Sequence, residues 1–471
     1  MTTGLDVPAL SGRRLFLDPD VFLVPTDDTN VLAYAPLPGL LLEVNPSAAA
    51  WLEQLRSPGG SPVSPGYETI AAQLRAARVL LDSPPLPRIP KRPRVAPFRP
   101  GQVSLFLTGG CNLRCVYCHS RGGERPVTLD PCVASTAVEA VSRTVRSLGQ
   151  SQFTVHLHGG GEPTSVPELL KRVVGDAERI AARQGLGVRF SLGTNGVMSE
   201  AMARWVIQHI HRATVSMDGP PEIQDRQRPL ADGSGSHALL RRTLALFDDA
   251  GFSYSLRMTV TRESVEQLPR SVRYLIASSR AATIKAEPVF AAGRALSRGL
   301  EPPEAQGFVE AFSEADELAR QEGRRLVYSG CRPDIISPRF CAAAAGSFCV
   351  TPEGAISACY EVVDPNDERA ARFFFGHVRP EQDRLDIDEQ RRSWLAHQTV
   401  DNMAECTDCF AKWHCAGDCL AKTQLGSVAA SAKRLHRSDR CIINRELTRR
   451  SLLATFRSGA DLRASDASDC D

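Results

Sequence analysis

Three closely spaced cysteines are the residues of this chain best suited to chemistry. Cys111, Cys115 and Cys118 have the spacing CxxxCxxC and directly follow the apolar run 103–107. Three thiolates on one loop suit a four-iron cluster that leaves one iron without a protein ligand, and such an open iron can bind a substrate or a cofactor. The alternatives are a zinc knuckle or buried free cysteines. A zinc site would usually need a fourth Cys or His at a similarly short spacing, and the adjacent His119 is awkwardly placed.

A second set of cysteines lies toward the C-terminus. Cys341 is followed by twelve residues, Gly354, four residues and Cys359. The other members have spacings of two, five and three residues, and a more distant one ends the set: Cys406, Cys409, Cys415, Cys419 and Cys441. A CxxC followed by a CxxxC could form a zinc ribbon. Seven spaced cysteines together with the upstream triad favour iron–sulfur clusters instead.

Short apolar runs alternate with longer helical patterns between residues 102 and 290, which predicts a parallel sheet. The six runs are 103–107, 153–157, 188–192, 213–217, 254–260 and 283–289. In such a sheet the ligand site lies at the carboxyl ends of the strands. The motifs fall there in order along the chain: the cysteine loop, Gly159-Gly160-Gly161-Glu162-Pro163, Thr194-Asn195-Gly196 and Asp218-Gly219. Four motifs in register indicate a single site.

Together these motifs resemble the signature of the radical S-adenosylmethionine (AdoMet, SAM) enzymes. The resemblance implies an α/β fold with a partial (βα)6 barrel, whose cluster lies near the open mouth and chelates the amino and carboxylate groups of AdoMet. It places the cluster on Cys111, Cys115 and Cys118. It also implies AdoMet ligands: Gly160, Gly161, Glu162 and Pro163 for the amino group, Ser191 and Arg228 for the carboxylate, Asn195 in the same loop set, and Tyr117 packed beside cluster and adenine. Gly193 departs from the Gln of many sulfatase-maturing relatives. His156 and His158 are expected to be structural.

The C-terminal cysteines resemble the SPASM extension, which in radical AdoMet peptide and protein modifiers holds two auxiliary four-iron clusters. The resemblance implies three [4Fe-4S] clusters in all. It assigns Cys341, Cys359 and Cys419 to the first auxiliary cluster and Cys406, Cys409, Cys415 and Cys441 to the second. The fourth ligand of the first is open: Cys331 fits by order along the chain, Cys349 in an apparent strand is the alternative, and a site without a fourth ligand is the third option. Cys132 and Cys470 are expected to be inert.

Residues 1–82 are predicted to form a small α+β unit. Strand-length runs at 21–24, 31–34 and 40–44 precede an amphipathic helix capped by Asn45, and a second helix is expected near 67–81. This order resembles the winged-helix leader-recognition element of ribosomal-peptide maturases, which receives its peptide as an added edge strand. The alternative is a structural cap. A proline-rich linker follows at 83–101, then the radical SAM core at 102–300, a helical connector at 301–330, the SPASM domain at 331–445, and a C-terminal helix and polar tail at 446–471.

Composition narrows the classes of partner. The 471 residues suit two or three domains, and 56 basic against 54 acidic residues give no global field for nucleic acid or a membrane surface. The N-terminus lacks a basic segment followed by an apolar stretch, and Pro36 and Pro38 interrupt the most apolar run. We therefore expect no secretion signal, no membrane span and a cytoplasmic location. Clustered cysteines in that reducing compartment usually indicate metal or redox chemistry.

The resemblance implies a radical SAM oxidoreductase that reductively cleaves AdoMet to a 5′-deoxyadenosyl radical and oxidises a ribosomal precursor peptide. The expected product is an intrapeptide carbon–carbon or thioether link, and the reductant an external carrier such as flavodoxin or ferredoxin. Sulfatase maturases usually carry Asp directly after the Cys that ends the Gly-x4-Cys segment, as the presumed base. Here Tyr360 and Glu361 follow Cys359 and could replace it. This departure and the N-terminal unit favour peptide maturation over formylglycine formation.

Two other readings stay open: a peptide epimerase, with a free Cys as hydrogen donor, and a non-catalytic iron–sulfur peptide scaffold. Glu162, Ser191 and Arg228 argue against the scaffold, because a protein that does not bind AdoMet has no need of AdoMet ligands. Glu287, at the end of the sixth run, is expected either to bind substrate in the same cavity or to be a solvated loop carboxylate.

Overall fold

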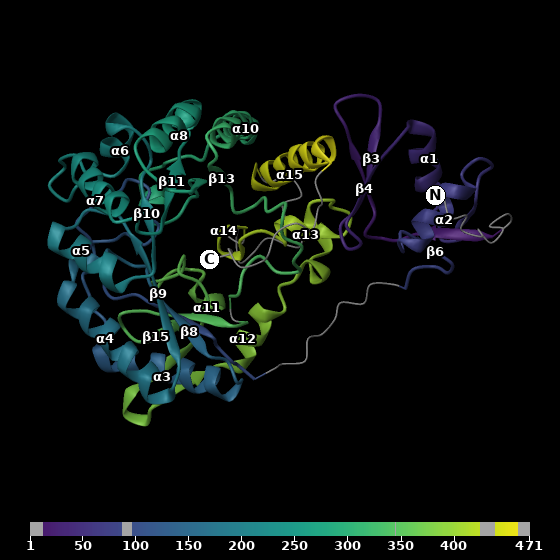
Figure 1. Ribbon diagram of the computed structural model, residues 1–471. Helices are drawn as coiled ribbons and strands as arrows, with labels where there is room; N and C mark the ends of the chain where they lie inside the picture. Colours follow the sequence, from purple (N-terminus) through teal and green to yellow (C-terminus); the bar gives the residue numbers. More distant parts are fainter. Residues whose placement is uncertain (1–12, 87–96, 344, 424–438, 460–471) are drawn as a thin grey trace.

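The computed structural model describes residues 13–86, 97–343, 345–423 and 439–459. Residues 1–12, most of the expected linker and the expected polar tail with Cys470 lie outside the described residues. A large α/β body and a smaller N-terminal unit lie side by side, with the long helix α15 (Asp439–Ser458) between them (Figure 1). No described helix combines the length and apolarity needed to cross a membrane.

The core of the large body is a parallel sheet, as the sequence predicts. The six expected runs form strands that lie next to one another in chain order: β7 (Gln102–Leu105), β8 (Gln152–Leu157), β9 (Gly187–Thr194), β10 (Arg212–Ser216), β11 (Tyr254–Val260) and β12 (Thr283–Pro288). Each neighbouring pair is parallel. Burial alternates along these strands, because one face packs on helices and the other faces the interior of the curved sheet.

Helices cover the outer face of this sheet (Figure 1). They are α3 (Pro131–Ser147), α4 (Pro167–Gln184), α5 (Glu200–His209), α6 (Pro221–Gln227), α7 (His237–Asp249) and α8 (Leu268–Ala277), with short 3-10 turns η1 (Pro163–Ser165) and η2 (Val265–Gln267). Local sequence explains their ends: the Asp130 side chain accepts from the Cys132 amide at the start of α3, and Gly185 takes a left-handed conformation where α4 ends. The expected α/β barrel architecture is confirmed.

The sheet is wider than the sequence predicts, because strands from the C-terminal third extend both edges. β13 (Arg325–Val327) adds parallel to β12, and β14 (Ser347–Val350) adds parallel to β7. Three antiparallel strands continue from β14: β15 (Ala355–Ser357), β16 (Phe374–Arg379) and β17 (Arg384–Ile387). The cysteine-rich region is therefore continuous with the barrel sheet.

Short helices complete the C-terminal region. They are α9 (Gly293–Ser297), α10 (Ala305–Gln321), α11 (Ala370–Phe373), η3 (Pro380–Gln382), α12 (Glu389–Ala396), η4 (Val400–Asn402), η5 (Ala404–Cys406), α13 (Lys412–Cys415) and α14 (Leu420–Thr423). The expected C-terminal helix is α15; it begins at Asp439, before the predicted position 446, and carries Cys441.

The N-terminal unit has a hydrophobic core of its own. The three expected strands form an antiparallel sheet in the order β2 (Phe22–Pro25), β3 (Val31–Ala35) and β4 (Leu40–Val44). Helix α1 (Pro46–Gln54) begins at the predicted cap, where the Asn45 side chain accepts from the Ala48 amide at 2.9 Å. Helix α2 (Glu68–Ala76) ends before the predicted position 81, since the chain turns into β6 (Leu80–Leu81). This strand pairs with the unpredicted strand β1 (Arg14–Leu17). β5 (Ser61–Pro62) lies on the other side of β1.

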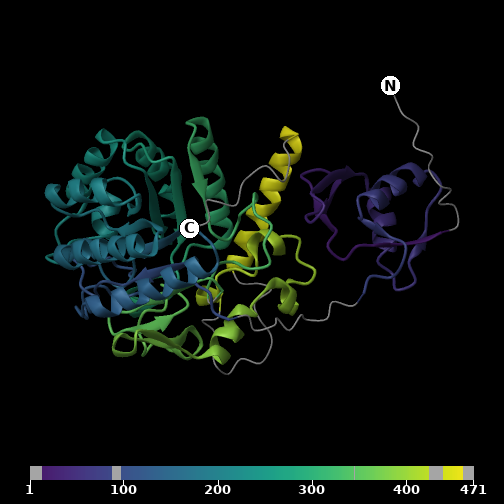
Figure 2. The ribbon, with the colours of Figure 1, turned by 60° about the horizontal axis from the view of Figure 1, so that its bottom comes forward.

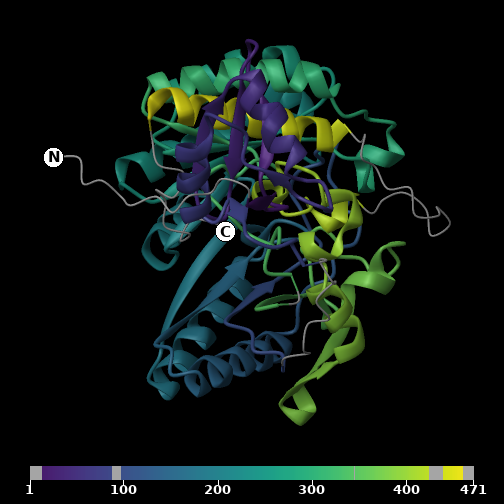
Figure 3. The same ribbon diagram turned by 90° about the vertical axis from the view of Figure 1, so that its right-hand side faces the viewer.

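This unit packs on α15 and on the cysteine-rich loops, and Figures 2 and 3 show the contact from two further directions. A shared apolar cluster joins the β2–β3 strands to the C-terminal region: Phe22, Val24, Leu32, Tyr34, Val400, Trp413, Ala416, Leu452 and Leu453. Buried polar contacts lie within it. Lys412 pairs with Asp20 at 2.5 Å, and the Tyr34 hydroxyl and His414 Nε2 share a hydrogen bond.

Candidate functional site

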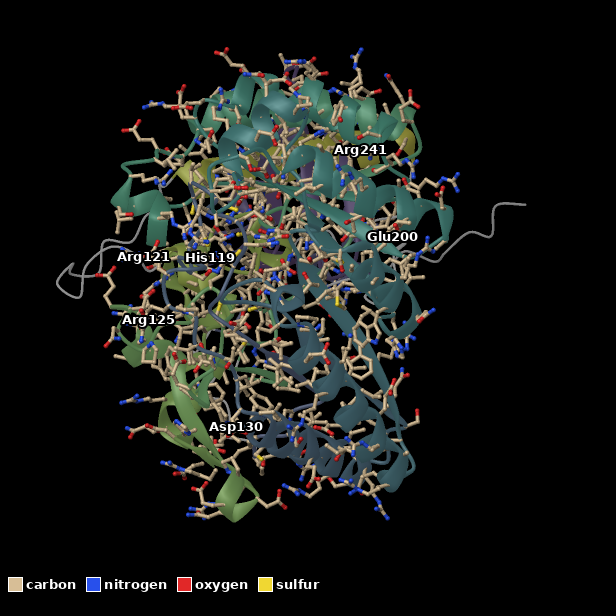
Figure 4. The ribbon with its side chains drawn as sticks, turned by 90° about the vertical axis from the view of Figure 1, so that its left-hand side faces the viewer. His119, Arg121, Arg125, Asp130, Glu200 and Arg241 are labelled. Atoms are coloured by element: carbon tan, nitrogen blue, oxygen red, sulfur yellow. The ribbon has the colours of Figure 1, made fainter. Side chains whose placement is uncertain are left out.

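The three cysteines of the CxxxCxxC loop lie at the carboxyl end of β7 and line one cavity of about 190 Å³. Backbone contacts hold the loop in place. Arg294 of α9, which is buried, donates to the carbonyls of Cys115 at 2.8 Å and Gly122 at 2.7 Å. Figure 4 views the loop from the barrel side: Arg121 and Arg125 lie at the edge of the molecule, and His119 lies farther in.

The thiols are held in a setting that suits iron–sulfur ligation. Burial, with a contribution from Glu162, raises the pKa of Cys111 to about 11, and burial raises that of Cys115 to about 12. Amide donors approach two of the sulfurs: the Leu113 N–H lies 3.4 Å from Cys111 Sγ, and the Gly122 N–H lies 3.3 Å from Cys118 Sγ. Bonds of this kind stabilise thiolates bound to iron. Within the described residues, no three Cys, His, Asp or Glu side chains form a group that could hold a single metal ion.

The glycine loop after β8 packs directly on the cysteine loop. Gly160 has a left-handed conformation (φ 64°), and a Cβ there would lie 2.8 Å from the Thr108 carbonyl oxygen. At Gly161 a Cβ would lie 1.8 Å from the Gly110 carbonyl oxygen, which no side chain could tolerate. Glycine is therefore required for the two backbones to meet, and the loop presents bare main chain to the cavity.

Glu162 ties this loop to the one after β9. Its buried carboxylate accepts four hydrogen bonds: from Thr164 N at 3.1 Å, Thr164 Oγ1 at 2.8 Å, Thr194 Oγ1 at 2.7 Å and Asn195 N at 2.7 Å. Burial nevertheless raises its pKa. The Asn195 side chain in turn donates to Asn112 Oδ1 at 2.7 Å and lies 3.8 Å from Cys111 Sγ. In the structure Glu162 fixes the relative position of three loops, and its contact with an AdoMet ammonium group stays a prediction.

Asp218 organises the opposite side of the triad. Its carboxylate pairs with Arg228 Nε at 3.1 Å and accepts from the Tyr117 hydroxyl and from the Thr259 amide at 2.9 Å. The Arg228 guanidinium lies over the Tyr117 ring at 5.2 Å and reaches to 3.9 Å from Cys115 Sγ. A positive charge is thus held beside the cysteine loop. The sequence pointed to Asp218 only as part of the Asp218-Gly219 motif and did not predict its contacts with Arg228 and Tyr117.

Some predicted site residues lie elsewhere. Ser191 and Pro163 are not in the cavity wall. The Ser191 hydroxyl instead shares a 2.5 Å hydrogen bond with Nδ1 of His156, its direct partner on the neighbouring strand β8. His158, expected to be structural, does line the cavity: its ring packs against Gly193 and lies 5.0 Å from the Tyr360 ring. Gly193 explains this placement, because a larger side chain there would collide with the imidazole.

Charged side chains from β11, β12, the turn after β15 and α14 form the remaining wall, defined here as the polar wall: Arg257, Glu287, Glu361 and Lys422. Glu287 is 3% exposed and accepts from the Ser329 amide and hydroxyl, both at 2.9 Å. The alternative of a solvated loop carboxylate is therefore wrong. Although burial raises the pKa of Glu361, His119, Lys422 and Arg257 lower it to about 2. Sequence analysis did not single out Arg257 or Lys422, which lie in no motif.

The C-terminal cysteines fall into two groups. Cys406, Cys409, Cys415 and Cys441 are within electrostatic range of one another, and so are Cys341, Cys359 and Cys419. Cys349 is buried on β14 and feels the charge of Cys341. Cys331 lies beside α15, where Thr448 Oγ1 is 3.7 Å from its sulfur, and the charges that most affect it belong to Asp316, Asp334 and Arg332. The structure thus favours Cys349 over Cys331 as the neighbour of the group formed by Cys341, Cys359 and Cys419.

Comparison with known proteins identifies the central part of the chain. Residues 105–275 match the radical SAM superfamily. Mycofactocin maturase MftC of Mycobacterium ulcerans is 36% identical over 167 residues, which cover 34% of this chain and 40% of that protein. The cysteine-type anaerobic sulfatase-maturating enzyme of Clostridium perfringens (strain 13) is 25% identical over 170 residues, covering 36% and 46%. The chain therefore spans less than half the length of these relatives.

The fold is also that of a solved structure, native anSMEcpe with bound AdoMet. The two share 15% identity with a TM-score of 0.58, over 76% of this chain and 98% of the other. The same enzyme with AdoMet and the Cp18Cys peptide gives a TM-score of 0.59 at 16% identity, over 76% and 99%. The likeness covers more of the chain than the matched superfamily region does.

Proposed function

We propose that this chain, which contains a radical SAM domain, is a peptide maturase that uses AdoMet and a four-iron cluster to oxidise a ribosomally made peptide. The observation that carries the proposal is the convergence of the cysteine triad, the bare glycine loop and the Asp218–Arg228 pair on one cavity. The partial relatives support it, because one is named as a maturase of mycofactocin and the other of sulfatases.

The residues present fit the implied cofactors. Cys111, Cys115 and Cys118 would hold a cluster with one open iron, and N–H groups already point at two of these sulfurs. Gly160, Gly161, Glu162 and Pro163 would receive the amino end of AdoMet, with Tyr117, Ser191, Asn195 and Arg228 as its other ligands. When bound, cluster and AdoMet supply hydrogen-atom abstraction from an unactivated carbon.

The protein's own side chains would orient the ligands in the cavity and exclude water from it. Asp218 fixes the Arg228 guanidinium beside Cys115, so that a carboxylate in the cavity meets a positioned cation. Val289, Phe290 and Tyr360 give the mouth of the cavity an apolar lining, which limits access of water and of unwanted hydrogen donors.

The second part of the proposal concerns the C-terminal cysteines. Cys406, Cys409, Cys415 and Cys441 would hold one auxiliary [4Fe-4S] cluster, and Cys341, Cys359 and Cys419 another, making three clusters in the protein. The Asn444 amide lies 3.1 Å from Cys415 Sγ and supports the first assignment. For the fourth ligand of the cluster on Cys341, Cys359 and Cys419, the proximity of Cys349 to Cys341 supports Cys349 more than the predicted Cys331.

The third part concerns the peptide. The antiparallel sheet of the N-terminal unit has β2 and β4 at its edges, and an added strand at one edge is the mode by which leader peptides are recognised in the proteins that this unit resembles. We propose that residues 13–82 bind a leader in this way. An external carrier such as flavodoxin or ferredoxin would supply electrons, in the cytoplasm.

Formylglycine formation is the second candidate, because the fold matches anSMEcpe. The position after Cys359 holds Tyr360 in place of Asp. We therefore favour an intrapeptide cross-link. Fragmentation of the product separates the two reactions, because it shows either a link between two residues or an aldehyde on one residue.

The proposal is tested by anaerobic reconstitution with iron and sulfide, reduction, and assay of 5′-deoxyadenosine. We expect its formation by the wild type and its loss in Cys115→Ala. Cys132→Ala is the matched control, because Cys132 is exposed at the start of α3, away from the cavity. Absence of 5′-deoxyadenosine from a wild type that holds the full iron content would overturn the proposal in favour of a scaffold.

A further inference from the structure

The polar wall contains two carboxylates whose charges are already balanced. Glu287 accepts two hydrogen bonds from Ser329 and lies 3.6 Å from Lys422 Nζ. Glu361 lies 3.7 Å from the same ammonium group and 3.8 Å from His119 Nδ1. Lys422, which is buried, thus sits between both carboxylates. Arg257 also stabilises both negative charges, but no hydrogen bond joins it to either carboxylate among the described residues.

Arg257 is the most exposed member of the polar wall. Its side chain is 27% exposed and lines the cavity, and the closest carboxylate oxygen, Glu361 Oε1, is 4.0 Å away. With the part of the chain that the structure describes, its guanidinium makes no hydrogen bond. A guanidinium has five N–H donors, and polar groups in such enclosed sites are normally bonded.

The other arginine in the described wall of the cavity behaves differently. Arg228 pairs with Asp218 at 3.1 Å and is almost fully buried. Two buried polar atoms near Arg257, His158 Nδ1 and Glu361 Oε2, receive no hydrogen bond from the described residues. Arg228 Nε also lacks a well-aligned hydrogen bond within the described residues, but it lies 3.1 Å from the Asp218 carboxylate, whereas the carboxylate oxygen that Arg257 approaches is 4.0 Å away.

We propose that Arg257 binds a carboxylate of the peptide substrate, either an Asp or Glu side chain or the C-terminal carboxylate. This inference rests on the proposed function and names the substrate feature that it recognises. A planar guanidinium binds a carboxylate through two parallel hydrogen bonds, so it fixes orientation as well as affinity. Because Arg257 and the cysteine triad line the same cavity, a carboxylate held there brings the adjoining carbon of the peptide into that cavity.

The test uses the full-length, cluster-loaded protein with AdoMet under anaerobic conditions. The probe is a random library of short peptides, prepared once with free and once with amidated C-termini, and bound peptides are identified by mass spectrometry. Wild type, Arg257→Gln, Arg257→Lys and the control Arg262→Gln are compared. Arg262 follows the same strand but is exposed and pairs with Glu301 outside the cavity. Iron content, AdoMet affinity and 5′-deoxyadenosine formation are measured for each protein.

We expect the wild type and Arg262→Gln to enrich carboxylate-bearing peptides by about tenfold or more, and Arg257→Gln to lose this enrichment. Arg257→Lys should fall between, because it keeps the charge and loses the fork. Enrichment of Asp or Glu identifies a side-chain carboxylate, and dependence on a free terminus identifies the C-terminal one. Equal binding of neutral peptides by the wild type overturns the inference.

A tenfold loss of AdoMet affinity in Arg257→Gln with unchanged peptide selection also overturns it, since the bound carboxylate would then be that of AdoMet. These outcomes are distinct from failure of the proposed function, in which the wild type itself forms no 5′-deoxyadenosine.

Discussion

The buried ion pair between Asp20 and Lys412 should determine how firmly the N-terminal unit is held against the cysteine-rich region. The two side chains are 8% and 1% exposed and meet at 2.5 Å. Lys412 also donates to the Thr407 carbonyl at 3.2 Å, and Trp413 Nε1 donates to Asp20 at 3.1 Å. The change to make is Lys412→Met, which keeps the length of the side chain and removes its charge.

The Lys412→Met change leaves the Asp20 carboxylate buried without this cation, and breaking a buried ion pair by removal of one partner costs ~3–5 kcal/mol in other proteins. If that cost falls on the contact between the N-terminal unit and the cysteine-rich region, the population of molecules in which these two regions separate rises by about a hundredfold to a few thousandfold. The double variant Asp20→Asn with Lys412→Met removes both charges and should recover much of the loss, because an uncharged buried pair is tolerated far better than a single buried charge.

Hydrogen–deuterium exchange of the cluster-loaded protein measures this opening locally. Peptides from β2–β3 and from the loop around Lys412 should exchange faster in Lys412→Met by the factor given above. The matched control is Arg457→Ala at the same contact, whose pair with Asp27 is 64% and 55% exposed and should contribute less than ~1 kcal/mol. Equal exchange in Lys412→Met and the wild type, or strictly additive effects of the Asp20 and Lys412 changes, would refute the reasoning.

Three further predictions concern the site. Gly161→Ala should abolish 5′-deoxyadenosine formation, because its Cβ would lie 1.8 Å from a carbonyl oxygen of the cysteine loop, whereas Gly175→Ala on α4 meets nothing within 4 Å and should leave activity intact; equal activities would contradict the packing of the two loops. Asp218→Asn should weaken AdoMet binding by about tenfold or more in equilibrium binding, because it leaves the arginine that it pairs with uncompensated; an unchanged affinity would remove Asp218 from the site. Cys415→Ala should lower the iron content by about one four-iron cluster in metal analysis while Cys132→Ala does not, and equal iron in the two variants would contradict the second auxiliary cluster.

Local patterns made the barrel predictable. Each of the six apolar runs became a strand, because alternation and flanking turns are encoded within a few residues, and the motifs then fell at one edge by topology alone. The helix after Asn45 was likewise predictable from its cap. The edges of the sheet were not. β14 pairs with β7 although the rest of the barrel lies between them in the sequence, and β15–β17 continue the sheet from β14. These pairings depend on tertiary contacts and leave no periodic signal in the sequence.

The site divides in the same way. The cysteines and Glu162 lie in motifs of fixed spacing, so their convergence could be expected. Arg257 and Lys422 reach the cavity from an interior strand face and from a helix far along the chain, where a single charged residue looks like any solvated one. The role of Ser191 stays a prediction. Its hydroxyl bonds to His156, its direct partner on β8, and this pairing is set by the strand register, which the sequence does not reveal.

The most direct test of the central claim is the mass of a short precursor peptide encoded beside this gene, after co-production with the enzyme under low oxygen. The account predicts the loss of two hydrogens with the wild type, located by fragmentation to a carbon–carbon or thioether link, and an unmodified peptide with Cys115→Ala. An unchanged mass in ordinary water with one deuterium gained at an α-carbon in deuterated water would replace cross-linking by epimerisation. An unmodified peptide in both solvents with the active, cluster-loaded wild type would contradict the claim that this chain matures that peptide.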